Sequence, residues 1–140
     1  MSPPRTILLA DDHRELREAT AELLRRQGFH VLTAASGTEA VERYAAAGSI
    51  DLLITDLNMP GLDGLQLTDH LRDRQPQLPV LLASSAPSAE LRQRHGRGEI
   101  AFLAKPFSAA QLSAALHQAE ALRPQLVQLS QSKGVSPIND

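Results

Sequence analysis

Acidic, hydroxyl and amino side chains follow four short apolar runs of the chain, at the point where each run ends. Two adjacent carboxylates come after residues 7–10, and a third comes after residues 52–55. A serine hydroxyl follows residues 80–83, and a lysine follows residues 100–104. In chain order, these side chains belong to Asp11, Asp12, Asp56, Ser84 and Lys105.

These residue types are suited to binding a metal ion and a phosphoryl group. Two carboxylates about 4 Å apart repel by roughly 4 kcal/mol at an effective dielectric of 20, so three together need a cation. Carboxylate, backbone carbonyl and water oxygens are the ligands that Mg²⁺ prefers. An Asp can also attack phosphorus to give an aspartyl phosphate. A hydroxyl and an ammonium group can then donate hydrogen bonds to the phosphoryl oxygens.

The choice of lysine at position 105 is informative in itself. The chain contains 12 Arg but only two Lys, Lys105 and Lys133. A lysine supplies a compact, strongly hydrated point charge on a flexible stem, whereas an arginine supplies a planar fork. The composition therefore indicates that this position requires an ammonium group.

The apolar runs before these residues have the length of β-strands. Five runs are present: 7–10, 29–34, 52–55, 80–83 and 100–104. Most lack a two-residue alternation, which is typical of strands covered on both faces. Helical spacing in the segments between them predicts a parallel sheet with helices on both faces. Ligands bind beyond the carboxyl ends of such strands, so we expect the polar side chains to gather there.

Five helices are predicted from the spacing of apolar residues and from their end signals. The first carries a stripe of Leu16, Ala19, Leu23 and Leu24 and stops before Gly28, and a capping box of Ser36 and Glu39 begins the second. The third contains Leu67 and Leu71 and ends before Pro76. The fourth, residues 88–97, is weakened by two glycines. The fifth begins at the N-cap Ser108 and carries Leu112, Leu116 and Ala119 on one stripe.

Composition excludes several classes of protein. The 140 residues suffice for one domain, and 42% apolar residues can form an aliphatic core. The formal net charge of −2 gives no general attraction to nucleic acid or to an anionic membrane. The chain has no Cys, which excludes disulfide scaffolds, thiol catalysis and Cys-based zinc sites. The apolar runs are too short to span a bilayer. We therefore expect a single cytoplasmic domain.

The motifs resemble those of the receiver domain of two-component response regulators, of the kind found in chemotaxis regulators. The resemblance is carried by Asp11-Asp12, by the segment 56–64 (Asp-Leu-Asn-Met-Pro-Gly-Leu-Asp-Gly), by Ser84 and by Lys105-Pro106-Phe107. It covers residues 6 to about 123. The resemblance implies a flavodoxin-like (βα)5 domain with strand order 2-1-3-4-5.

The resemblance also implies a role for each site residue. Asp56 would accept a phosphoryl group from a phosphohistidine of a histidine kinase or a histidine phosphotransfer protein. Asp12, Asp56 and the backbone carbonyl of Asn58 would bind Mg²⁺, and Asp11 would act through a metal-bound water. Lys105 would pair with Asp56 or its phosphate, across a cis Lys105–Pro106 peptide.

The same resemblance implies a switch. Ser84 and Phe102 would move together on phosphorylation and change the face formed by the fourth helix, the fifth strand and the fifth helix. Receivers of this kind often form homodimers through that face. The domain itself would not bind nucleic acid, and it would support only its own phosphorylation and dephosphorylation.

Simpler interpretations stand beside these assignments. Asp11 and Asp12 could be an N-cap pair for the first helix. The basic cluster Arg92, Arg94, His95 and Arg97 is typical of a solvated face, with a partner-docking surface as the alternative. The five histidines, at 13, 30, 70, 95 and 117, show no metal-ligand spacing and are predicted to lie on the surface.

Two other functions remain open. A haloacid-dehalogenase-type phosphatase also uses an Asp nucleophile, but it needs a second Asp two residues later, where this chain has Asn58. A receiver-like binding module that is never phosphorylated is the other alternative, and the intact acidic residues argue against it. We divide the chain into an N-terminal arm (1–5), the receiver domain (6–123) and a flexible tail or linker (124–140).

Overall fold

Five strands alternate with five helices in the computed structural model, which describes residues 4–122. The elements are β1 (Thr6–Ala10), α1 (Arg14–Arg26), β2 (His30–Ala34), α2 (Gly37–Ala47), β3 (Leu52–Asp56), α3 (Gly64–Arg72), β4 (Val80–Ser84), α4 (Ala89–Gly96), β5 (Ala101–Ala104) and α5 (Ala109–Ala121). All ten predicted elements are thus present. The predicted tail 124–140, and residues 1–3 of the predicted arm, lie outside the described residues.

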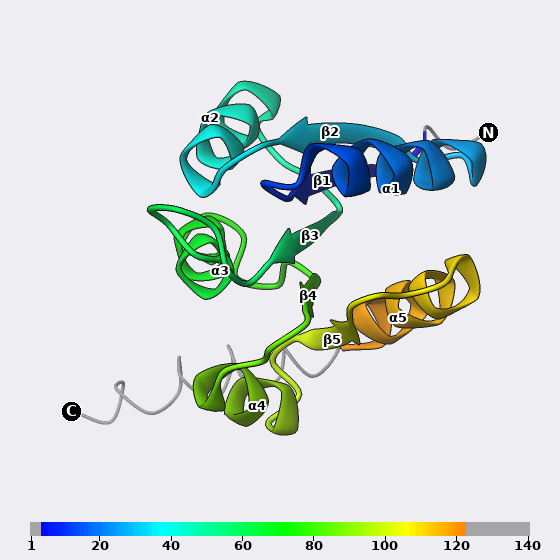
Figure 1. Ribbon diagram of the computed structural model, residues 1–140. Coiled ribbons are helices and arrows are strands. Elements are labelled where there is room, and N and C mark those ends of the chain that lie inside the picture. The colour runs from blue at the N-terminus through cyan, green and yellow to red at the C-terminus, as the bar shows by residue number, and fades with distance from the viewer. Residues whose placement is uncertain (1–3, 123–140) are drawn as a thin grey trace.

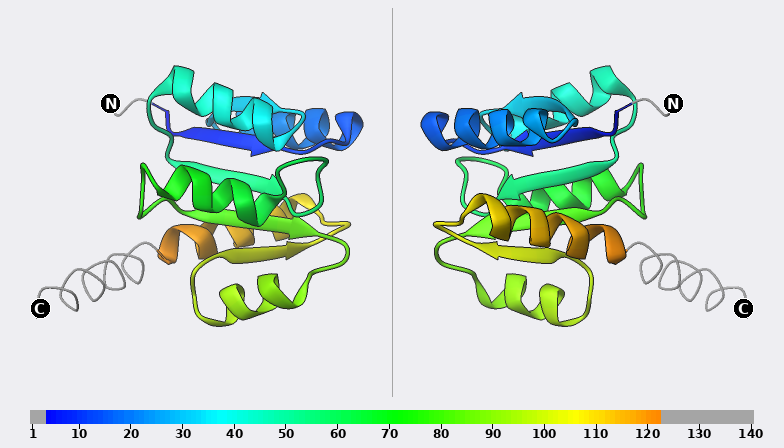
Figure 2. Two further views of the ribbon diagram at one scale, coloured as in Figure 1. Left: turned by 90° about the vertical axis from the view of Figure 1, so that its left-hand side faces the viewer. Right: turned by 90° about the vertical axis from the view of Figure 1, so that its right-hand side faces the viewer.

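The strands form one parallel sheet in the order β2-β1-β3-β4-β5, as the resemblance implied. Helices α1 and α5 cover one face, and α2, α3 and α4 cover the other (Figures 1 and 2). The inner strands β3 and β4 are buried at every residue, which explains their unbroken apolar runs. The edge strands β2 and β5 each carry exposed residues.

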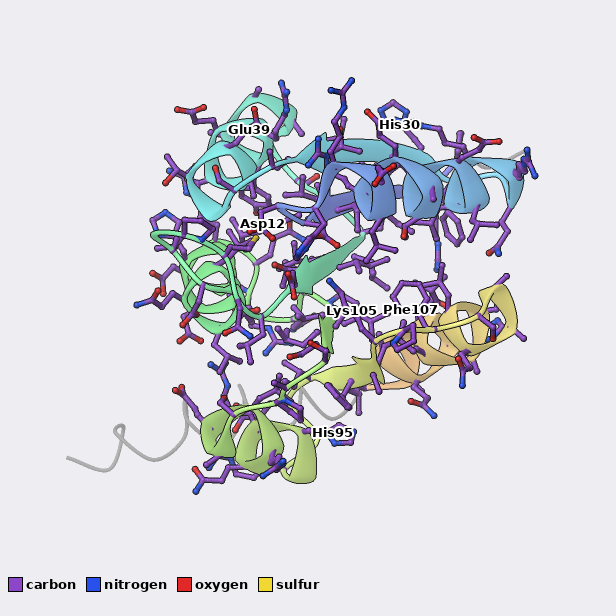
Figure 3. All side chains as sticks on the ribbon, viewed as in Figure 1. Asp12, His30, Glu39, His95, Lys105 and Phe107 are labelled. Atoms are coloured by element: carbon purple, nitrogen blue, oxygen red, sulfur yellow. The ribbon has the colours of Figure 1, made fainter. Side chains whose placement is uncertain are left out.

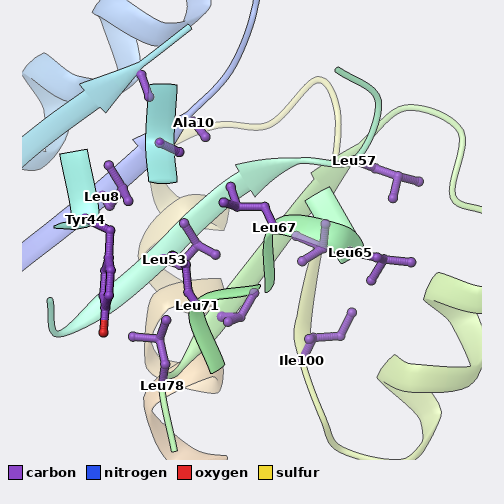
Figure 4. Close-up of a cluster of buried hydrophobic side chains, with 14 of the residues drawn as sticks. Leu8, Ala10, Tyr44, Leu53, Leu57, Leu65, Leu67, Leu71, Leu78 and Ile100 are labelled. Atoms are coloured by element: carbon purple, nitrogen blue, oxygen red, sulfur yellow. The ribbon is translucent and has the colours of Figure 1, made fainter. Parts of the chain in front are cut away.

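Two aliphatic clusters hold the helices against the sheet. The cluster under α2, α3 and α4 includes Leu53, Leu67, Leu71 and Ile100 (Figure 4). The cluster under α1 and α5 is formed mainly by Ile, Leu, Val and Ala residues. Burial of this apolar surface on both faces fixes where the strands end, and so fixes the positions of the residues that follow them.

Most helices begin at a polar side chain that caps them. Ser108 starts α5 with a reciprocal capping box to Gln111, which confirms the predicted N-cap. The predicted box at Ser36 is only half right. Its hydroxyl accepts from the Glu39 N–H, but the Glu39 carboxylate accepts from the N–H of Ala35, one residue before the N-cap.

Three sequence predictions are wrong, the last of them only in part. Asp11 and Asp12 do not cap α1, because its N-cap is His13, which makes no side-chain capping bond. Ala19 is exposed because Thr20 and Ala21 face the sheet instead. Arg94 is buried, whereas the other three members of the basic cluster are exposed.

At the end of the sheet opposite the carboxyl ends of the strands, the side chain of Gln75 links two loops by hydrogen bonds. The Gln75 side-chain oxygen accepts from the Tyr44 hydroxyl at 2.8 Å and from the Ile50 N–H at 3.0 Å. Its amide nitrogen donates to the Ile50 carbonyl at 3.0 Å. The loops that enter β3 and leave α3 are therefore pinned together.

Gly64 allows α3 to begin directly against the end of β3. Its N–H donates to the Leu57 carbonyl at 2.8 Å. A Cβ atom at this position would lie 2.3 Å from the Asp56 carbonyl oxygen and 2.8 Å from Leu82 Cδ1. The first of these neighbours is backbone, which cannot move without displacing Asp56. Glycine is therefore required here by a close approach.

We expect Gly64→Ala to destabilise the fold by about 1–3 kcal/mol, because the added methyl group overpacks the junction of β3 and α3. Urea denaturation measures this change. Gly96→Ala is the matched control, since nothing lies within 4 Å of a Cβ there, and it should leave the stability unchanged or slightly raised. Equal stability of the two variants would contradict the steric argument.

Candidate functional site

The parallel sheet brings the predicted polar residues to one edge. Asp56 is the last residue of β3, Ser84 is the last residue of β4, and Lys105 directly follows β5. The Lys105 N–H donates to the Ser84 carbonyl at 3.1 Å, which fixes these two strand ends side by side. The Asp11 N–H is likewise held by the Ala34 carbonyl at 3.0 Å.

Lys105 lies between two of the carboxylates. Its Nζ atom is 3.2 Å from Asp11 Oδ2 and 3.4 Å from Asp56 Oδ1. Its side chain is only 13% exposed, and the Lys105–Pro106 peptide that presents it is cis. Figure 3 labels Lys105 and Asp12, which extend from loops at the same end of the sheet. The ammonium group thus offsets part of the repulsion between two buried acids.

The ionised form of Asp56 is disfavoured by its surroundings. Burial raises its pKa, the nearby Lys105 opposes this effect, and the negative charges of Asp11 and Asp12 add to it. The net direction is upward, so the single ammonium group does not fully compensate the burial and the repulsion. A further cation would favour ionised Asp56.

Four side chains form a group that could hold a metal ion. One ligand atom from each of Asp11, Asp12, His13 and Asp56 lies within 4.8 Å of the others. Asp11 and Asp56 are buried and Asp12 is exposed. Three carboxylates arranged in this way fit a hard divalent ion such as Mg²⁺.

His13 is the member of this group that the sequence analysis missed. Its Nδ1 atom lies 3.3 Å from Asp11 Oδ1, 3.4 Å from Asp12 Oδ1 and 4.0 Å from Asp56 Oδ2. Its backbone N–H also donates to Asp11 Oδ1 at 2.9 Å. The side chain is exposed, as predicted for all five histidines, yet its ring faces the carboxylates. Direct adjacency to Asp11-Asp12 was the available signal.

Ser84 and Phe102 lie on neighbouring strands behind the carboxylates. Ser84 is buried, and its hydroxyl accepts from the Ala86 N–H at 3.0 Å. Phe102 pairs in register with Leu82, is partly buried, and packs against the α2–α4 core cluster. Asn58 is exposed, two residues beyond Asp56. Its role as a backbone ligand stays a prediction.

A cleft of about 620 Å³ opens beside Lys105. It runs between the start of α1 and the loop from β5 to α5, and apolar atoms, including those of polar side chains, make up most of its surface. The lining residues are His13, Arg14, Glu15, Leu16, Ser85, Lys105, Pro106 and Phe107. A group entering this cleft would meet the Lys105 ammonium and the His13 ring.

None of the helices in residues 4–122 combines the length and apolar character needed to cross a membrane.

Known proteins resemble this chain in sequence and in fold. Residues 7–117 match the model of the response regulator receiver domain. The response regulator protein FleR of Pseudomonas aeruginosa is 39% identical over 104 residues, which are 74% of this chain and 22% of FleR. The transcriptional activator protein PfeR of the same organism is 42% identical over 113 residues, 79% of this chain and 36% of PfeR. The chain thus spans well under half the length of these curated relatives.

A solved response regulator receiver protein from Sinorhizobium medicae shares 32% identity, with a TM-score of 0.76 over 86% of this chain and 97% of that one. The family match, the relatives and the sheet order agree with the acidic group at the strand ends. The chain belongs to the response regulator receiver domain family, whose members are phosphoacceptor switches in two-component signalling.

Proposed function

We propose that Asp56 is the phosphoacceptor of this receiver. The observation that carries the proposal is the position of Lys105, whose ammonium group lies within 3.4 Å of carboxylate oxygens of both Asp11 and Asp56. In the reaction, an Asp56 carboxylate oxygen attacks the phosphorus of a phosphohistidine. A P–O bond forms, the P–N bond breaks, and its electron pair returns to the donor imidazole.

Asp12, Asp56 and the backbone carbonyl of Asn58 would hold a Mg²⁺ ion directly, and Asp11 would do so through water. The bound ion would screen the negative charge of the incoming phosphoryl group. Lys105 keeps its contact with Asp11 while its other partner changes from the Asp56 carboxylate to a phosphoryl oxygen.

Ser84 would report the presence of the phosphoryl group. Its hydroxyl accepts a hydrogen bond from Ala86, a contact that it would exchange for donation to a phosphoryl oxygen. The movement of Ser84 would free space behind it for Phe102, on the neighbouring strand. This pair would couple Asp56 to the face formed by α4, β5 and α5, which is also the candidate homodimer face.

The donor is proposed to be a histidine kinase or a histidine phosphotransfer protein, and it would approach through the cleft beside Lys105. The mostly apolar lining suits a protein donor that brings its own imidazole. We further propose that the chain works in the cytoplasm, and that it catalyses no reaction on another substrate. The downstream partner would be an output domain or a separate protein.

Intact mass spectrometry tests the phosphoacceptor directly. The chain is incubated with a small phosphodonor and Mg²⁺, beside Asp56→Asn. We expect one phosphoryl adduct on the wild-type chain and none on the variant. A second receiver serves as control for the donor.

Other outcomes separate the alternatives. An adduct that survives in Asp56→Asn would assign the chemistry to another residue. Sustained donor hydrolysis in that variant would favour an enzyme. A wild-type chain that stays unmodified with both an active small donor and a phosphorylated phosphotransfer protein would favour the binding-module alternative.

Mg²⁺ should stabilise the fold, because it relieves the repulsion among three carboxylates. At a concentration tenfold above its dissociation constant, the ion should add about 1.4 kcal/mol to the free energy of unfolding. Melting curves with millimolar Mg²⁺, compared with NaCl at equal ionic strength, measure this effect. Equal melting temperatures in the two salts would contradict the metal site.

Asp56→Asn should stabilise the metal-free fold at neutral pH, by an amount on the order of 1 kcal/mol. The pKa of Asp56 is raised in the folded chain, so its ionisation opposes folding. The gain of the variant should therefore be absent below the ordinary value of 3.8 and should grow as the pH rises through the raised pKa.

Urea denaturation from pH 3 to pH 8 in a chelator checks this pH dependence (the range brackets the ordinary and raised carboxyl pKa values). Glu42→Gln, which removes an exposed carboxylate of α2, is the control for the loss of one negative charge. A metal-free Asp56→Asn protein that is less stable than the wild-type chain at neutral pH would refute the repulsion argument.

A further inference from the structure

Helix α4 has little apolar packing of its own. Among its eight residues only Leu91 and Arg94 are buried. The other apolar contribution is small because Ala89 and Gly96 are exposed. A short helix held by one leucine is marginal without further contacts, since most helix stability in proteins comes from packing. Arg94 is the other buried residue of α4, so its contacts bear on how the helix is held.

Arg94 joins α4 to a neighbouring helix. Its side chain is 10% exposed and forms a fork with the Asp69 carboxylate of α3. The Nη2 atom lies 2.7 Å from Asp69 Oδ1, and Nη1 lies 3.3 Å from Oδ2. A two-pronged pair of this kind fixes direction as well as distance, so it resists a rotation or a slide of α4 along α3.

The same guanidinium also joins α4 to the entrance of β5. Its Nε atom donates to Glu99 Oε1 at 3.1 Å, and Arg97 binds the other oxygen of Glu99 at 2.6 Å. Burial raises the pKa of Glu99, but Arg97 and Arg94 outweigh this effect and lower it overall. Glu99 is therefore an anion at neutral pH, as this arrangement requires.

Arg72 of α3 holds the backbone beneath this cluster. Its guanidinium donates to the Leu78 carbonyl at 2.9 Å and to the Glu99 carbonyl at 2.7 Å. Burial, and the repulsion of Arg94, lower the pKa of Arg72 to about 10, so it keeps its charge at neutral pH. Residues from α3, α4 and the loop before β5 are thus joined in one polar network.

The next residue of α4 touches the proposed switch aromatic. The His95 ring lies 6.1 Å from the Phe102 ring, centroid to centroid, at an interplanar angle of 55°. Figure 3 shows His95 at the side of α4. Adjacent residues of one helix turn therefore fix α4 to α3 and contact the aromatic ring of β5.

These contacts belong to the resting arrangement of the site. The Ser84 hydroxyl accepts a hydrogen bond from the Ala86 N–H. The Lys105 ammonium group pairs with the carboxylates of Asp11 and Asp56, so both groups have partners within the protein. A change in the face of α4, β5 and α5 that moves α4 along α3 would separate Arg94 from Asp69, because the fork tolerates little displacement. The pair therefore favours the resting arrangement over a changed one.

We propose that the fork between Arg94 and Asp69 is a latch that holds α4 in its resting position and so opposes activation of the receiver. The proposal rests on the proposed function, since it concerns the switch driven by phosphorylation. By linkage, a contact that stabilises only the resting state weakens the binding of any ligand that prefers the active state.

Asp69→Asn tests the latch, because it removes one charge from an exposed partner and leaves the buried Arg94 paired with Glu99. Glu90→Gln is the matched control. Glu90 also faces Arg94, at 4.0 Å, but it lies on α4 itself and cannot tie α4 to α3. Both variants change one exposed carboxylate to an amide, so both should fold.

Two measurements follow on each protein. Amide hydrogen exchange reports how firmly residues 89–96 are held without any phosphoryl analogue. Titration with beryllium trifluoride and Mg²⁺ reports the affinity for a phosphoryl analogue. In Asp69→Asn we expect faster exchange in α4 and a tighter analogue affinity, each by about two- to fivefold, which is the range for a partly exposed ion pair. Glu90→Gln should match the wild-type chain in analogue affinity, and its exchange in α4 should rise less than in Asp69→Asn, since it loses only a first-turn carboxylate.

The remaining outcomes are decisive against the latch. Unchanged exchange in α4 of Asp69→Asn would show that the fork does not hold the helix. Faster exchange with unchanged or weaker analogue affinity would show that it serves stability alone. Equal effects in Glu90→Gln would show that the contact to α3 is not special. If the wild-type chain binds no analogue, the proposed function fails, and the exchange data alone decide whether the fork anchors α4.

Discussion

Charge balance at the carboxyl ends of the strands is the constraint on which the rest of the site depends. Three carboxylates meet there because parallel strands end at a common edge, and the apolar core leaves them no freedom to separate. One ammonium group, from Lys105, lies between Asp11 and Asp56. Burial raises the pKa of Asp56 and the charges of Asp11 and Asp12 add to this effect, while Lys105 opposes it. The excess of negative charge at this site favours the binding of a cation.

The strand ends and helix α4 are held by different kinds of contact. Close packing at Gly64 holds the backbone of Asp56 in place, and the backbone bond from Lys105 to Ser84 fixes the two strand ends behind it. These contacts leave little room for movement. Helix α4 differs, since polar contacts with α3 and with the loop before β5 supplement a single buried leucine. Such contacts can be exchanged at low cost, whereas a packed core cannot.

The sequence predicted the sheet, the helices and the gathering of polar side chains, because strand length and the ends of parallel strands follow from local pattern. The sequence predictions failed for residues whose position depends on a partner from another element. His13 faces the carboxylates because it is the N-cap of α1, directly after Asp11 and Asp12, which periodicity did not reveal. Arg94 looked solvated because its acidic partners Asp69 and Glu99 come from other elements. The Glu39 carboxylate accepts from the N–H of Ala35, one residue before the N–H that the capping pattern indicated. Residue spacing alone cannot distinguish these two neighbouring donors.

The glutamine at the opposite end of the sheet has a practical consequence for protein engineering. Gln75 ties together the Tyr44 hydroxyl and both backbone groups of Ile50, at the end of the strands away from Lys105 and Asp56. Substitutions at this end of the sheet would leave the groups proposed to bind metal and phosphate untouched. The Gln75 contacts and the acidic group lie at opposite ends of the sheet, so substitutions at one end need not disturb the other.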